Sequence, residues 1–575
     1  MKNFEVAELL RNIAQLLEIQ GELIFKIRAY EKAALTIENL EEDITEIWKQ
    51  NKLEELPGIG KALAEKISEF LKTGKLDYYE KLKKQVPVKV EELRKIPGLG
   101  PKTTLKLYKR LNIKTVNELE KAAKEGKIQE IEGLGATVEH NLLKSIEFAK
   151  SSGKRFLLGH ALDIAEEIKN KLKSLSCVDK IEIAGSLRRR KETIGDIDIL
   201  AESKKAEEVM SFFTKMNDVE EILAKGNLKS SVRLKEGLQA DLRIVEEKSY
   251  GAALLYFTGS KQHNIALRKI AIKRGMKLSE YGIFDKKSDK MLAGKTEEEC
   301  YKKLGLQYIE PEIREDESSI EAAKKGILPK LIGYKDIKGD LQMHTEWSDG
   351  NNTIEEMAAA AKQLGYEYIC ITDHTGQLKI ANALDKEGIV KQRKEIDRIN
   401  EKLQKKLQNF TILQGIEVNI KNNGALDMKN DVLKQIDIVL ASIHSGFRNP
   451  KEKITDRIIK AMENEHVDII AHPFGRLINS RPGLEMDFYK ILEKARETKT
   501  VLEINAYPER LDLSDVHVRA AINAKVKLSI GTDSHDASQL RNCKLGIAVA
   551  RRGWAEKKDI INSYALNDMI KLLKL

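Results

Sequence analysis

Short apolar runs, each ending in polar residues, recur through the C-terminal half of this chain and limit its fold more than any other feature. The runs are YEYICITDH, ILQGIEVN, DIVLASIHS, VDIIAHPF, VLEINAY and LSIGTDSHD, and helical patterns separate most of them. Strands that alternate with helices pair in parallel, and the carboxyl ends of the strands in a βα barrel meet on one face. The pattern therefore predicts a parallel βα barrel over residues 336–575, with its chemistry on that face.

Five of the ten histidines fall at these predicted strand ends, mixed with carboxylates. An isolated histidine is usually a satisfied core or surface residue, but five that converge on one face favour a metal centre. Imidazole and carboxylate together suit Mn²⁺, Zn²⁺ or Fe, and several such ions can generate hydroxide and stabilise a phosphate. The candidate residues are His344, Asp349, Asp373, His374, Glu417, His444, His472, Glu503, Asp533 and His535.

The first polar segment of the barrel, KGDLQMHTEWSDG, leaves one position open. His344 and Asp349 follow a short apolar run, as ligands at a strand end would. Two residues earlier, where a second ligand on the same side of the strand would lie, the chain has Gln342. The amide oxygen of glutamine is a neutral, weak ligand. We expect an active centre with one metal ion held more loosely, and whether Gln342 is a ligand stays an open question.

Length and composition place few limits on function. At 575 residues the chain is too long for one core, and roughly three or four domains are expected. The formal net charge of +10 permits nucleic-acid binding without establishing it. The four cysteines form no C-x-x-C pair, which argues against a disulfide framework and fits a reducing cytoplasm. No apolar run approaches the ~20 residues of a transmembrane helix, and the acid-bearing N-terminus is unlike a signal peptide.

Three related segments occur near the N-terminus: LPGIGKALAEKI, IPGLGPKTTLKLY and IEGLGATVEHNLL. In each, an apolar residue precedes a Gly-x-Gly turn and a helical pattern. Gly60, Gly100 and Gly135 are expected to adopt positive φ and to leave N–H groups open at a helix N-terminus, which attracts anions. The pattern resembles the helix-hairpin-helix motif, which holds a DNA phosphate without reading bases, and it makes Gly58, Gly60, Gly98 and Gly100 candidate DNA-binding residues. The alternative is an ordinary turn between helices, and the third copy, which lacks proline, is the weaker case.

Acids at alternate positions mark two strand patterns further along, IEIAGSLRRRKETIGDIDIL and LQADLRIV. Asp196 and Asp198 would share one face of a strand, and Asp241 lies on the second strand. Three carboxylates on one face repel each other unless divalent cations neutralise them, and oxygen ligands of this kind suit Mg²⁺. Two such ions can clamp the attacking and leaving oxygens of a phosphoryl transfer. The alternative is a half-exposed strand with its acids in water.

A glycine–serine pair and a basic cluster just before the two acids favour a nucleotidyltransferase site. GSLRRRKETIGDIDIL resembles the palm motif of the X family of DNA polymerases, to which eukaryotic DNA polymerase beta belongs. LLYFTGSKQHNIALRKIA resembles that family's nucleotide-binding segment, and the resemblance covers residues 1–310 in motif order. It implies that Asp196, Asp198 and Asp241 bind two Mg²⁺ (or Mn²⁺) ions, and that Asp241 helps to activate the primer 3′-hydroxyl.

The same resemblance implies how a deoxynucleoside triphosphate is held. Ser186 and Arg189 would hold the triphosphate tail, with positive charge also from Arg188. Tyr256, Phe257 and Gly259 would line the sugar pocket and disfavour a 2′-hydroxyl, with core packing of the two rings as the alternative. Asn264 would contact the minor groove of the base pair, and Arg268 the template side. The implied nucleotide-binding residues are Gly185, Ser186, Arg189, Gly195, Tyr256, Phe257, Gly259, Asn264 and Arg268.

In the N-terminal segment, Lys66 falls where the family's lyase domain has its Schiff-base lysine. Lys26 and Tyr30, in FKIRAYEKAA, match that domain's 5′-phosphate-binding stretch. A lyase needs an amine of depressed pKa in a basic pocket, whereas a lysine on a helix is usually solvated. The lyase role of Lys66 and solvent exposure of its amine are both open, and phosphate binding by this domain is the firmer expectation.

The barrel motifs LQMHTEWSDG, ITDH, GIEVN, SIHS, AHPFGR and GTDSH resemble the PHP domain (polymerase and histidinol phosphatase), a distorted βα barrel with a metal cluster. The resemblance implies a Mn²⁺ or Zn²⁺ cluster held by His344, Asp349, His374, Glu417, His444, His472, Asp533 and His535. Asp373 and Glu503 are expected to support these ligands or to bind occasionally. Arg476 could meet a substrate phosphate or lie in solvent.

A palm followed by a PHP barrel is similar to bacterial and archaeal family X DNA polymerases, in which the PHP half is a 3′–5′ exonuclease, usually Mn²⁺-dependent. The expected division is 1–82 lyase-like helical, 83–150 helical DNA-binding, 151–245 palm, 246–312 thumb-like, 313–335 linker and 336–575 PHP. We expect a monomeric repair enzyme that fills short gaps in primed or gapped DNA and processes 3′ ends or abasic sites. The alternatives are a PHP phosphoesterase for a small metabolite and a non-catalytic scaffold that binds DNA ends.

Overall fold

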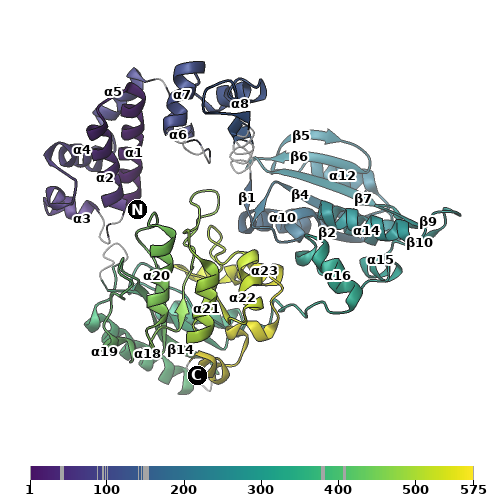
Figure 1. The fold of residues 1–575 in the computed structure, drawn as a ribbon. Helices are drawn as coiled ribbons and strands as arrows, with labels where there is room; N and C mark the ends of the chain where they lie inside the picture. Colours follow the sequence, from purple (N-terminus) through teal and green to yellow (C-terminus); the bar gives the residue numbers. More distant parts are fainter. Residues whose placement is uncertain are drawn as a thin grey trace.

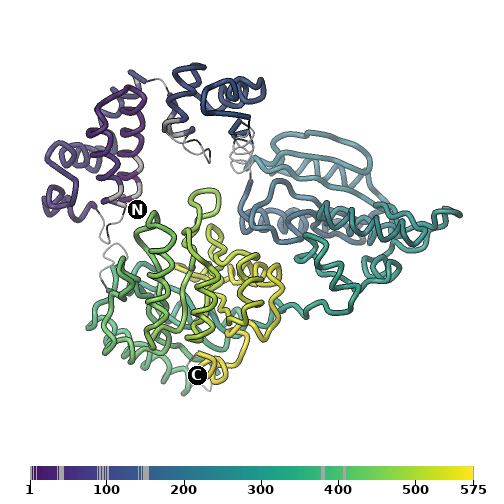
Figure 2. Tube along the Cα trace, in the orientation of Figure 1, coloured from purple at the N-terminus to yellow at the C-terminus, as the bar shows by residue number. Residues whose placement is uncertain are grey.

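The computed structural model describes most of the chain, and Figures 1 and 2 show its course from the N-terminal helices to the C-terminal barrel. The residues outside the description are 1, 39, 41–43, 87, 94, 95, 97, 98, 100, 137, 140, 141, 144, 145, 147–154, 377–381, 406–408, 574 and 575. Gly98 and Gly100, two of the expected DNA-binding residues, therefore lie outside the described residues.

The N-terminal segment is helical, as its sequence pattern predicts. It contains α1 (Lys2–Gln20), α2 (Ile24–Glu38), α3 (Ile44–Lys49), α4 (Lys61–Thr73), α5 (Asp77–Gln85), α6 (Val90–Leu93), α7 (Pro101–Leu111) and α8 (Val116–Lys124). Apolar side chains from these helices form one hydrophobic cluster that extends from Val6 to Ile146. In Figure 1 the helices, in purple and blue, lie above the barrel and lead into the palm.

The first Gly-x-Gly turn shows which glycine needs conformational freedom. A hydrogen bond donated by the backbone N–H of Ile59 closes a four-residue turn, in which Gly58 is the third residue and has φ +85°. A type II turn requires positive φ at that position. Gly60 is extended instead, at φ −87°, and caps α4. The expectation of positive φ at Gly60 is therefore wrong, and in the third copy Gly133 (φ +81°), not Gly135, has the positive value.

The palm is a five-stranded sheet in the order β2-β4-β7-β6-β5. Its strands are β2 (Lys180–Ile183), β4 (Asp196–Glu202), β5 (Val219–Lys225), β6 (Lys229–Leu234) and β7 (Gln239–Val245). β4 and β7 are parallel neighbours, whereas the other strand pairs are antiparallel. Helices α10 (Leu158–Lys173) and α12 (Ala206–Thr214) pack on the sheet and bury an apolar core.

The thumb-like part follows the palm and extends beyond its expected limits. It contains α13 (Tyr250–Thr258), α14 (Lys261–Lys273), β8 (Met276–Ser279), β9 (Gly282–Asp285), β10 (Met291–Ala293) and α15 (Glu297–Lys303). Residues 313–335, expected to be a linker, begin instead with structure that belongs to this core. Helix α16 (Glu317–Lys325) buries Ile320 and Ala323 in the same hydrophobic cluster as α14, because its apolar residues recur at helical spacing.

The C-terminal half is a parallel barrel, as the strand pattern predicts. Its strands are β11 (Gly339–Asp340), β12 (Tyr368–Ile371), β13 (His374–Thr375), β14 (Thr411–Asn419), β15 (Ile438–Ser442), β16 (Ile469–Ile470), β17 (Val501–Asn505) and β18 (Leu528–Gly531). Every pair among them is parallel. Next to β11 and β18, a parallel bridge joins Met343 to Ser534, so the last strand returns to the first.

Helices cover the outside of this barrel. They include α17 (Ile354–Gln363), α18 (Lys386–Lys405), α20 (Lys451–Met462), α21 (Phe488–Thr498), α22 (Asp515–Asn523), α23 (Cys543–Arg552) and α24 (Leu566–Leu573). The predicted multidomain fold class, with helical N-terminal segments, an α+β sheet domain and a βα barrel, is confirmed. Among the described helices, none is long and apolar enough to cross a membrane.

Candidate active sites

The palm brings the three predicted carboxylates together. Asp198 on β4 pairs in register with Asp241 on β7, and Asp196 lies two residues before Asp198 on the same face. Burial, followed by the charges of Asp196 and Asp241, raises the pKa of Asp198 to about 6. Burial also raises the pKa of Asp241, but hydrogen bonds from Gln239 and Lys229 outweigh it and lower the pKa overall. Lys229 Nζ lies 3.1 Å from Asp241 Oδ2, so the site already attracts one cation and fits divalent ions.

The glycine–serine turn lies directly against these carboxylates. Gly185 has φ +63°, and a Cβ placed there would collide with Asp198 Oδ2, so this position requires glycine. Ser186 is in the first turn of the short helix α11 (Gly185–Arg188). Gly195 immediately precedes β4, and a Cβ there would approach the Arg155 guanidinium to 3.3 Å. At Gly185, therefore, the backbone lies directly against the Asp198 carboxylate.

The predicted nucleotide-binding segment folds as α13, a turn and α14. The rings of Tyr256 and Phe257 meet edge to face at 5.1 Å. Asn264 Nδ2 donates to the carbonyl oxygen of Tyr256 at 2.7 Å, and the Arg268 guanidinium lies 5.3 Å from the Tyr256 ring centroid. Sequence patterns did not single out Arg243, which lies two residues beyond Asp241 on the same face of β7 and whose guanidinium lies 4.3 Å from the Phe257 ring centroid.

The two arginines of the basic cluster differ in what their charges face. Arg188 donates to both carboxylate oxygens of Glu297, at 2.9 and 2.7 Å, so the expectation that it supplies positive charge to phosphates is wrong. Glu297 is buried, and a buried carboxylate requires a partner of opposite charge. Arg189 donates to the carbonyl oxygen of Thr258 and, at 3.2 Å, to Glu315. The Arg189 side chain lies beside the nucleotide-binding segment but is held by protein acceptors.

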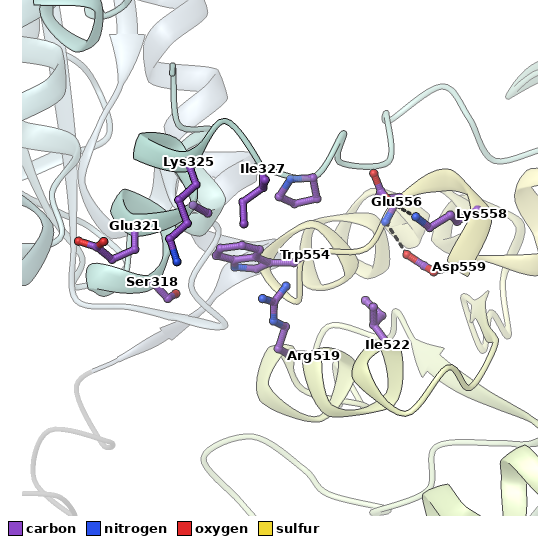
Figure 3. A pocket seen from close by; sticks show the side chains of 12 residues that line it. Ser318, Glu321, Lys325, Ile327, Arg519, Ile522, Trp554, Glu556, Lys558 and Asp559 are labelled. Carbon is purple, nitrogen blue, oxygen red and sulfur yellow. Dashed lines mark hydrogen bonds and ion pairs between the residues drawn. The ribbon is translucent and has the colours of Figure 1, made fainter. Parts of the chain in front are cut away.

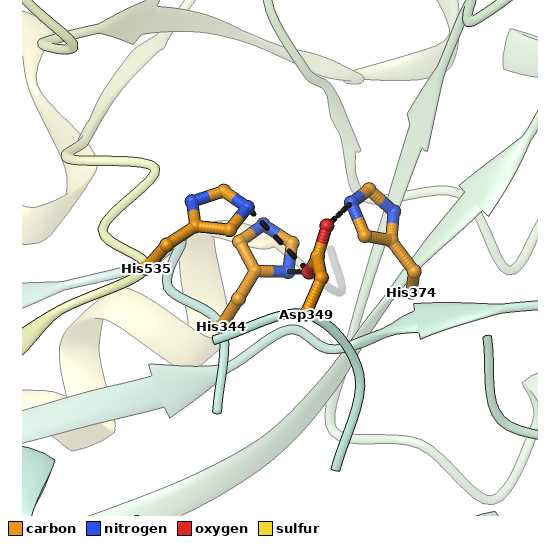
Figure 4. Close-up of side chains that lie close together, drawn as sticks. All are labelled: His344, Asp349, His374 and His535. Atoms are coloured by element: carbon orange, nitrogen blue, oxygen red, sulfur yellow. Dashed lines mark ion pairs between the residues drawn. The ribbon is translucent and has the colours of Figure 1, made fainter. Parts of the chain in front are cut away.

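At the barrel, the predicted residues converge at the carboxyl ends of the strands. Three overlapping groups bring their ligand atoms within 4.8 Å of one another: His344, Asp349, His374 and His535; His374, Glu417 and His444; and His344, Glu417 and Asp533. His472 joins them, with its Nε2 3.1 Å from Glu417 Oε1. Figure 4 shows Asp349 between His344 and His374, with His535 on the far side of His344.

The chemistry of this cluster fits metal ions. His344 Nδ1, His374 Nδ1, His472 Nδ1 and Glu503 Oε1 are buried atoms that make no hydrogen bond among the described residues. Burial is expensive for an unpaired polar atom, so such atoms mark ligand positions or lie beside them. Burial lowers the pKa of His374 to about 3, which leaves a neutral imidazole of the kind metals require. Three groups with these donors therefore fit a cluster of divalent ions.

Residues expected to support the ligands have distinct positions. Asp373 accepts four hydrogen bonds, from Thr345 N and Oγ1, Ser348 and Gln392, so it braces the segment that carries His344. Glu503 accepts from the backbone N–H of His472 at 2.7 Å. Neither belongs to the three groups found among the described residues. These hydrogen bonds orient the ligand-bearing segments.

Two arginines near the barrel face have roles that the sequence did not separate. Arg476, a candidate for substrate phosphate or solvent, does neither here: it donates to the carbonyl oxygen of Arg510 at 2.9 Å and pairs with Glu192 of the palm at 2.7 Å. Arg510 reaches the cluster, with Nε 3.5 Å from Asp533 Oδ2. The signal for Arg510 was its place in AYPERLDLS, directly after a predicted strand.

Gln342 is fully buried and lies at the cluster without belonging to any of the three groups found among the described residues. Its Nε2 donates to Glu417 Oε2 at 3.2 Å. Its Oε1 accepts from Asn505 Nδ2 at 3.5 Å. Asn505 Nδ2 also donates to Asp533 Oδ2 at 3.1 Å. Gln342 therefore supports the Glu417 carboxylate directly and contacts Asp533 only through Asn505.

The expected lyase residues meet around Tyr78 in the N-terminal segment. The Tyr30 and Tyr78 rings stack at 6.3 Å, and Lys66 Nζ lies 5.1 Å from the Tyr78 ring centroid. Lys66 Nζ also donates to the carbonyl oxygen of Ala62 at 3.1 Å. A hydrogen bond to Glu22 raises the pKa of Lys26 and keeps it cationic. The cluster thus combines two ammonium groups with two phenol rings.

Comparison with known domain families matches the helical segments, the palm, the thumb-like part and most of the barrel. The matches are a Helix-hairpin-helix domain at residues 1–76, a SAM-like Helix-hairpin-helix tandem at 90–147, a DNA polymerase beta palm at 160–273, a DNA polymerase beta thumb at 253–315 and a PHP domain at 340–507. The palm and PHP domains imply dependence on divalent metal ions. The thumb match includes the start of the expected linker.

A carboxylate-bearing palm and a histidine–carboxylate barrel on one chain define a protein with two metal-dependent phosphoryl-transfer sites. Over its whole length the chain is 40% identical to the DNA polymerase/3'-5' exonuclease PolX of Bacillus subtilis (strain 168), which is also covered in full. The chain belongs to this family of DNA polymerases with 3'-5' exonuclease activity. The chain is also 31% identical, over 222 residues, to a probable phosphatase of Thermoanaerobacter sp. (strain X514), and the match covers 37% of this chain and 84% of that protein.

Proposed function

We propose that this chain fills short gaps during DNA repair and that its PHP half removes nucleotides from 3′ ends, processing blocked ends and abasic sites. The substrates would be gapped or primed DNA and deoxynucleoside triphosphates, and the chain would act as a monomer. The observation that supports this most directly is the pairing of Asp198 with Asp241 beside a segment that orders Tyr256, Asn264 and Arg268.

In the palm, Asp196, Asp198 and Asp241 would hold two Mg²⁺ or Mn²⁺ ions, which supply the charge that clamps the attacking and leaving oxygens. Asp241 would help to activate the primer 3′-hydroxyl. Gly185 and Ser186 would present backbone and hydroxyl groups to the triphosphate, and Arg189 would join them. Tyr256, Phe257 and Gly259 would line the sugar pocket. Positioning and electrostatics, not covalent chemistry, account for the rate.

In the barrel, a Mn²⁺ or Zn²⁺ cluster would supply hydroxide and stabilise the phosphate of the strand end. The proposed ligands are His344, Asp349, His374, Glu417, His444, His472, Asp533 and His535. Asp373 and Glu503 hold the ligand-bearing segments in place. Arg510 lies beside Asp533 and could meet the phosphate of the strand.

A time course on one-nucleotide-gapped DNA, with and without deoxynucleoside triphosphate, tests both activities together. Asp198→Ala should abolish extension and keep 3′ trimming, whereas His374→Ala should abolish trimming and keep extension. Loss of both activities in either variant would contradict two separate sites. Absence of extension by the wild type at every gap size, with either Mg²⁺ or Mn²⁺, would refute the polymerase proposal.

The likeness of the chain to probable phosphatases supports a second candidate, hydrolysis of a small phosphoester at the barrel cluster. Comparing release from 3′-labelled DNA with release from a small phosphoester separates the two. The exonuclease proposal expects DNA to be much the better substrate.

For the N-terminal domain we propose 5′-phosphate binding by Lys26 and Tyr30, with Gly58, Gly60, Gly98 and Gly100 holding further phosphates, and a lyase role for Lys66. Borohydride should trap a covalent complex with 5′-deoxyribose phosphate DNA in the wild type. Lys66→Ala should remove this product without weakening binding to a plain 5′-phosphate.

A further inference from the structure

The PHP half holds the loop of the palm that lies next to the triphosphate site. This segment, the palm loop, comprises residues 189–192, between α11 and the short strand β3 (Thr193–Ile194), and includes Arg189. Arg552, at the end of α23, donates from Nη1 to the carbonyl oxygen of Arg189 at 2.8 Å. Arg476 pairs with Glu192 of the same loop at 2.7 Å. Two arginines of the exonuclease half therefore fix the backbone and one side chain of a polymerase element.

Arg552 is the more buried contact of the two. Its side chain is 4% exposed and also pairs with Glu315, at 2.8 Å, and with Asp515 on α22. A buried guanidinium needs acceptors for its donors, and here they come from the palm loop, from the segment before α16 and from the barrel. Arg552 thus joins three parts of the chain at one point.

Glu315 is shared between Arg552 and Arg189. Its Oε1 accepts from Arg552 Nη1 at 2.8 Å and from Arg189 Nε at 3.2 Å. Burial alone would raise the pKa of Glu315, but the charges of Arg552 and Arg189 lower it, so it is a carboxylate that attracts both arginines. The shorter contact belongs to Arg552, which therefore takes the larger share of this negative charge.

Arg189 is close to the nucleotide-binding segment but is not yet free to bind a phosphate. Its Nη1 donates to Thr258 O, and a Cβ on Gly259 would lie 3.1 Å from the same nitrogen. To meet a triphosphate, the guanidinium must exchange the Glu315 carboxylate for phosphate oxygens. The strength of the Glu315 contact therefore sets how readily Arg189 can bind.

We propose that Arg552 is a positioning residue of the polymerase site: it holds the palm loop through the Arg189 carbonyl and competes for Glu315, so that the Arg189 guanidinium can transfer to the triphosphate. The inference rests on the proposed polymerase function. The effect of Arg552 requires the folded surface of the PHP half and not its exonuclease chemistry. The barrel would therefore support nucleotide binding even when its own site is inactive.

A pocket of about 450 Å³ lies between α16 and α22. It is lined by Trp554, which is two residues beyond Arg552 in the chain, and by Arg519, Lys325 and Ile327. Figure 3 shows Arg519 beside the Trp554 ring, 3.8 Å from its centroid. Buried apolar side chains of the palm and the barrel also belong to one hydrophobic cluster, and Arg552 adds a polar contact at the palm loop.

The first experiment compares Arg552→Ala with Lys544→Ala. Lys544 also joins the halves, through a 3.1 Å ion pair with Asp163, but the pair is exposed and does not contact the palm loop. We expect Arg552→Ala to raise KM for deoxynucleoside triphosphate about ten-fold, equivalent to about 1.4 kcal/mol, with a smaller change in kcat. Trimming of 3′ ends should be unchanged, Arg552→Lys should be intermediate and Lys544→Ala should match the wild type.

The second experiment tests the competition for Glu315. If Arg552 acts by relieving Arg189, Glu315→Gln combined with Arg552→Ala should restore most of the lost affinity. Nucleotide binding to dideoxy-terminated gapped DNA measures this without turnover, so it remains decisive even if the wild type fails to extend. Unchanged nucleotide affinity in Arg552→Ala, or no recovery in the double variant, would overturn the proposal. If Arg552→Ala does not fold, Arg552→Lys with and without Glu315→Gln gives the same comparison.

Discussion

Asp198 illustrates how much a single buried carboxylate depends on its surroundings. The Asp-x-Asp spacing predicted that two acids share a face, and that is what β4 presents. Spacing could not predict that burial and two neighbouring carboxylates would raise the pKa of Asp198 to about 6. Protons and metal ions therefore compete for this group near neutral pH.

Asp198→Asn should stabilise the metal-free protein at pH 8 by about 2–3 kcal/mol, because the pKa of Asp198 is about 6 in the folded state and near 4 in the unfolded state. With its pKa raised, the ionised carboxylate destabilises the fold above about pH 6. This penalty disappears as the pH falls below the ordinary pKa near 4, so the variant should gain little there. Thermal unfolding at both pH values in a chelator measures the difference.

Asp196→Asn is the matched control, because Asp196 belongs to the same Asp-x-Asp pair but its side chain is exposed. Asp196→Asn should stabilise the metal-free protein at pH 8 by less than Asp198→Asn does. An equal gain in stability from both variants would contradict the conclusion that the ionised Asp198 carboxylate destabilises the fold. A gain for Asp198→Asn that is as large at pH 4 as at pH 8 would contradict it too. The pH dependence of Mg²⁺ binding should follow the same group, weakening as the pH falls through about 6.

Gln342 gives a second prediction for a single residue. Its amide donates to Glu417, so Gln342→Ala should destabilise the metal-free barrel by about 1.5–3 kcal/mol, the worth of a hydrogen bond to a charged group. The number of metal ions bound per chain should not change, because the structure uses the amide as a donor. Metal analysis after dialysis checks this, and loss of one ion per chain would show that Gln342 is a ligand.

Among the secondary-structure elements, the hairpin turns show where local sequence was enough and where it was not. The Gly-x-Gly pattern predicted a tight turn before a helix, which α4 confirms. It did not tell which glycine has positive φ, because that depends on the turn type set by the hydrogen bond of Ile59. The prediction of a linker at residues 313–335 was wrong for a related reason. The apolar pattern of α16 covers few residues, so the helix becomes evident only when it packs against α14.

Gly58→Ala should loosen the first hairpin. The position has φ +85°, which is unfavourable for alanine by about 1–2 kcal/mol, and the new Cβ would meet Lys32 Cδ at 3.0 Å. Hydrogen exchange of the amides in α4 should speed up accordingly. Gly60→Ala is the control, because Gly60 is extended and a Cβ there meets no atom within 4 Å. Equal effects from the two variants would contradict the turn assignment.

At the scale of the whole molecule, the halves meet through a shared apolar cluster and also through charged side chains that are far apart in sequence. Arg551 pairs with Glu312 at 2.7 Å and donates to the carbonyl oxygen of Ile332 at 2.8 Å. Both side chains of this pair are nearly buried, at 10% and 7% exposure. No periodicity connects residues more than two hundred positions apart, so the sequence could not predict this contact.

Arg551→Ala should leave Glu312 buried without its partner and destabilise the contact between the halves by about 3–5 kcal/mol. Limited proteolysis between α16 and β11 should then become faster. The double variant Arg551→Met with Glu312→Gln removes both charges and should recover much of the resistance. Failure of the double variant to recover would mean that Arg551 acts through packing and not through its charge.

The sequence by itself determined the elements of this protein and the chemistry at their ends. Helix and strand periods are local, and aspartate, histidine and glutamate bring their ligand chemistry wherever a strand ends, so the palm acids and the barrel cluster could be predicted. Only the tertiary structure decided which charges are neutralised and which remain available. Arg188 is committed to Glu297, and Arg189 shares Glu315 with Arg552, because domain packing sets those distances and no local pattern records them.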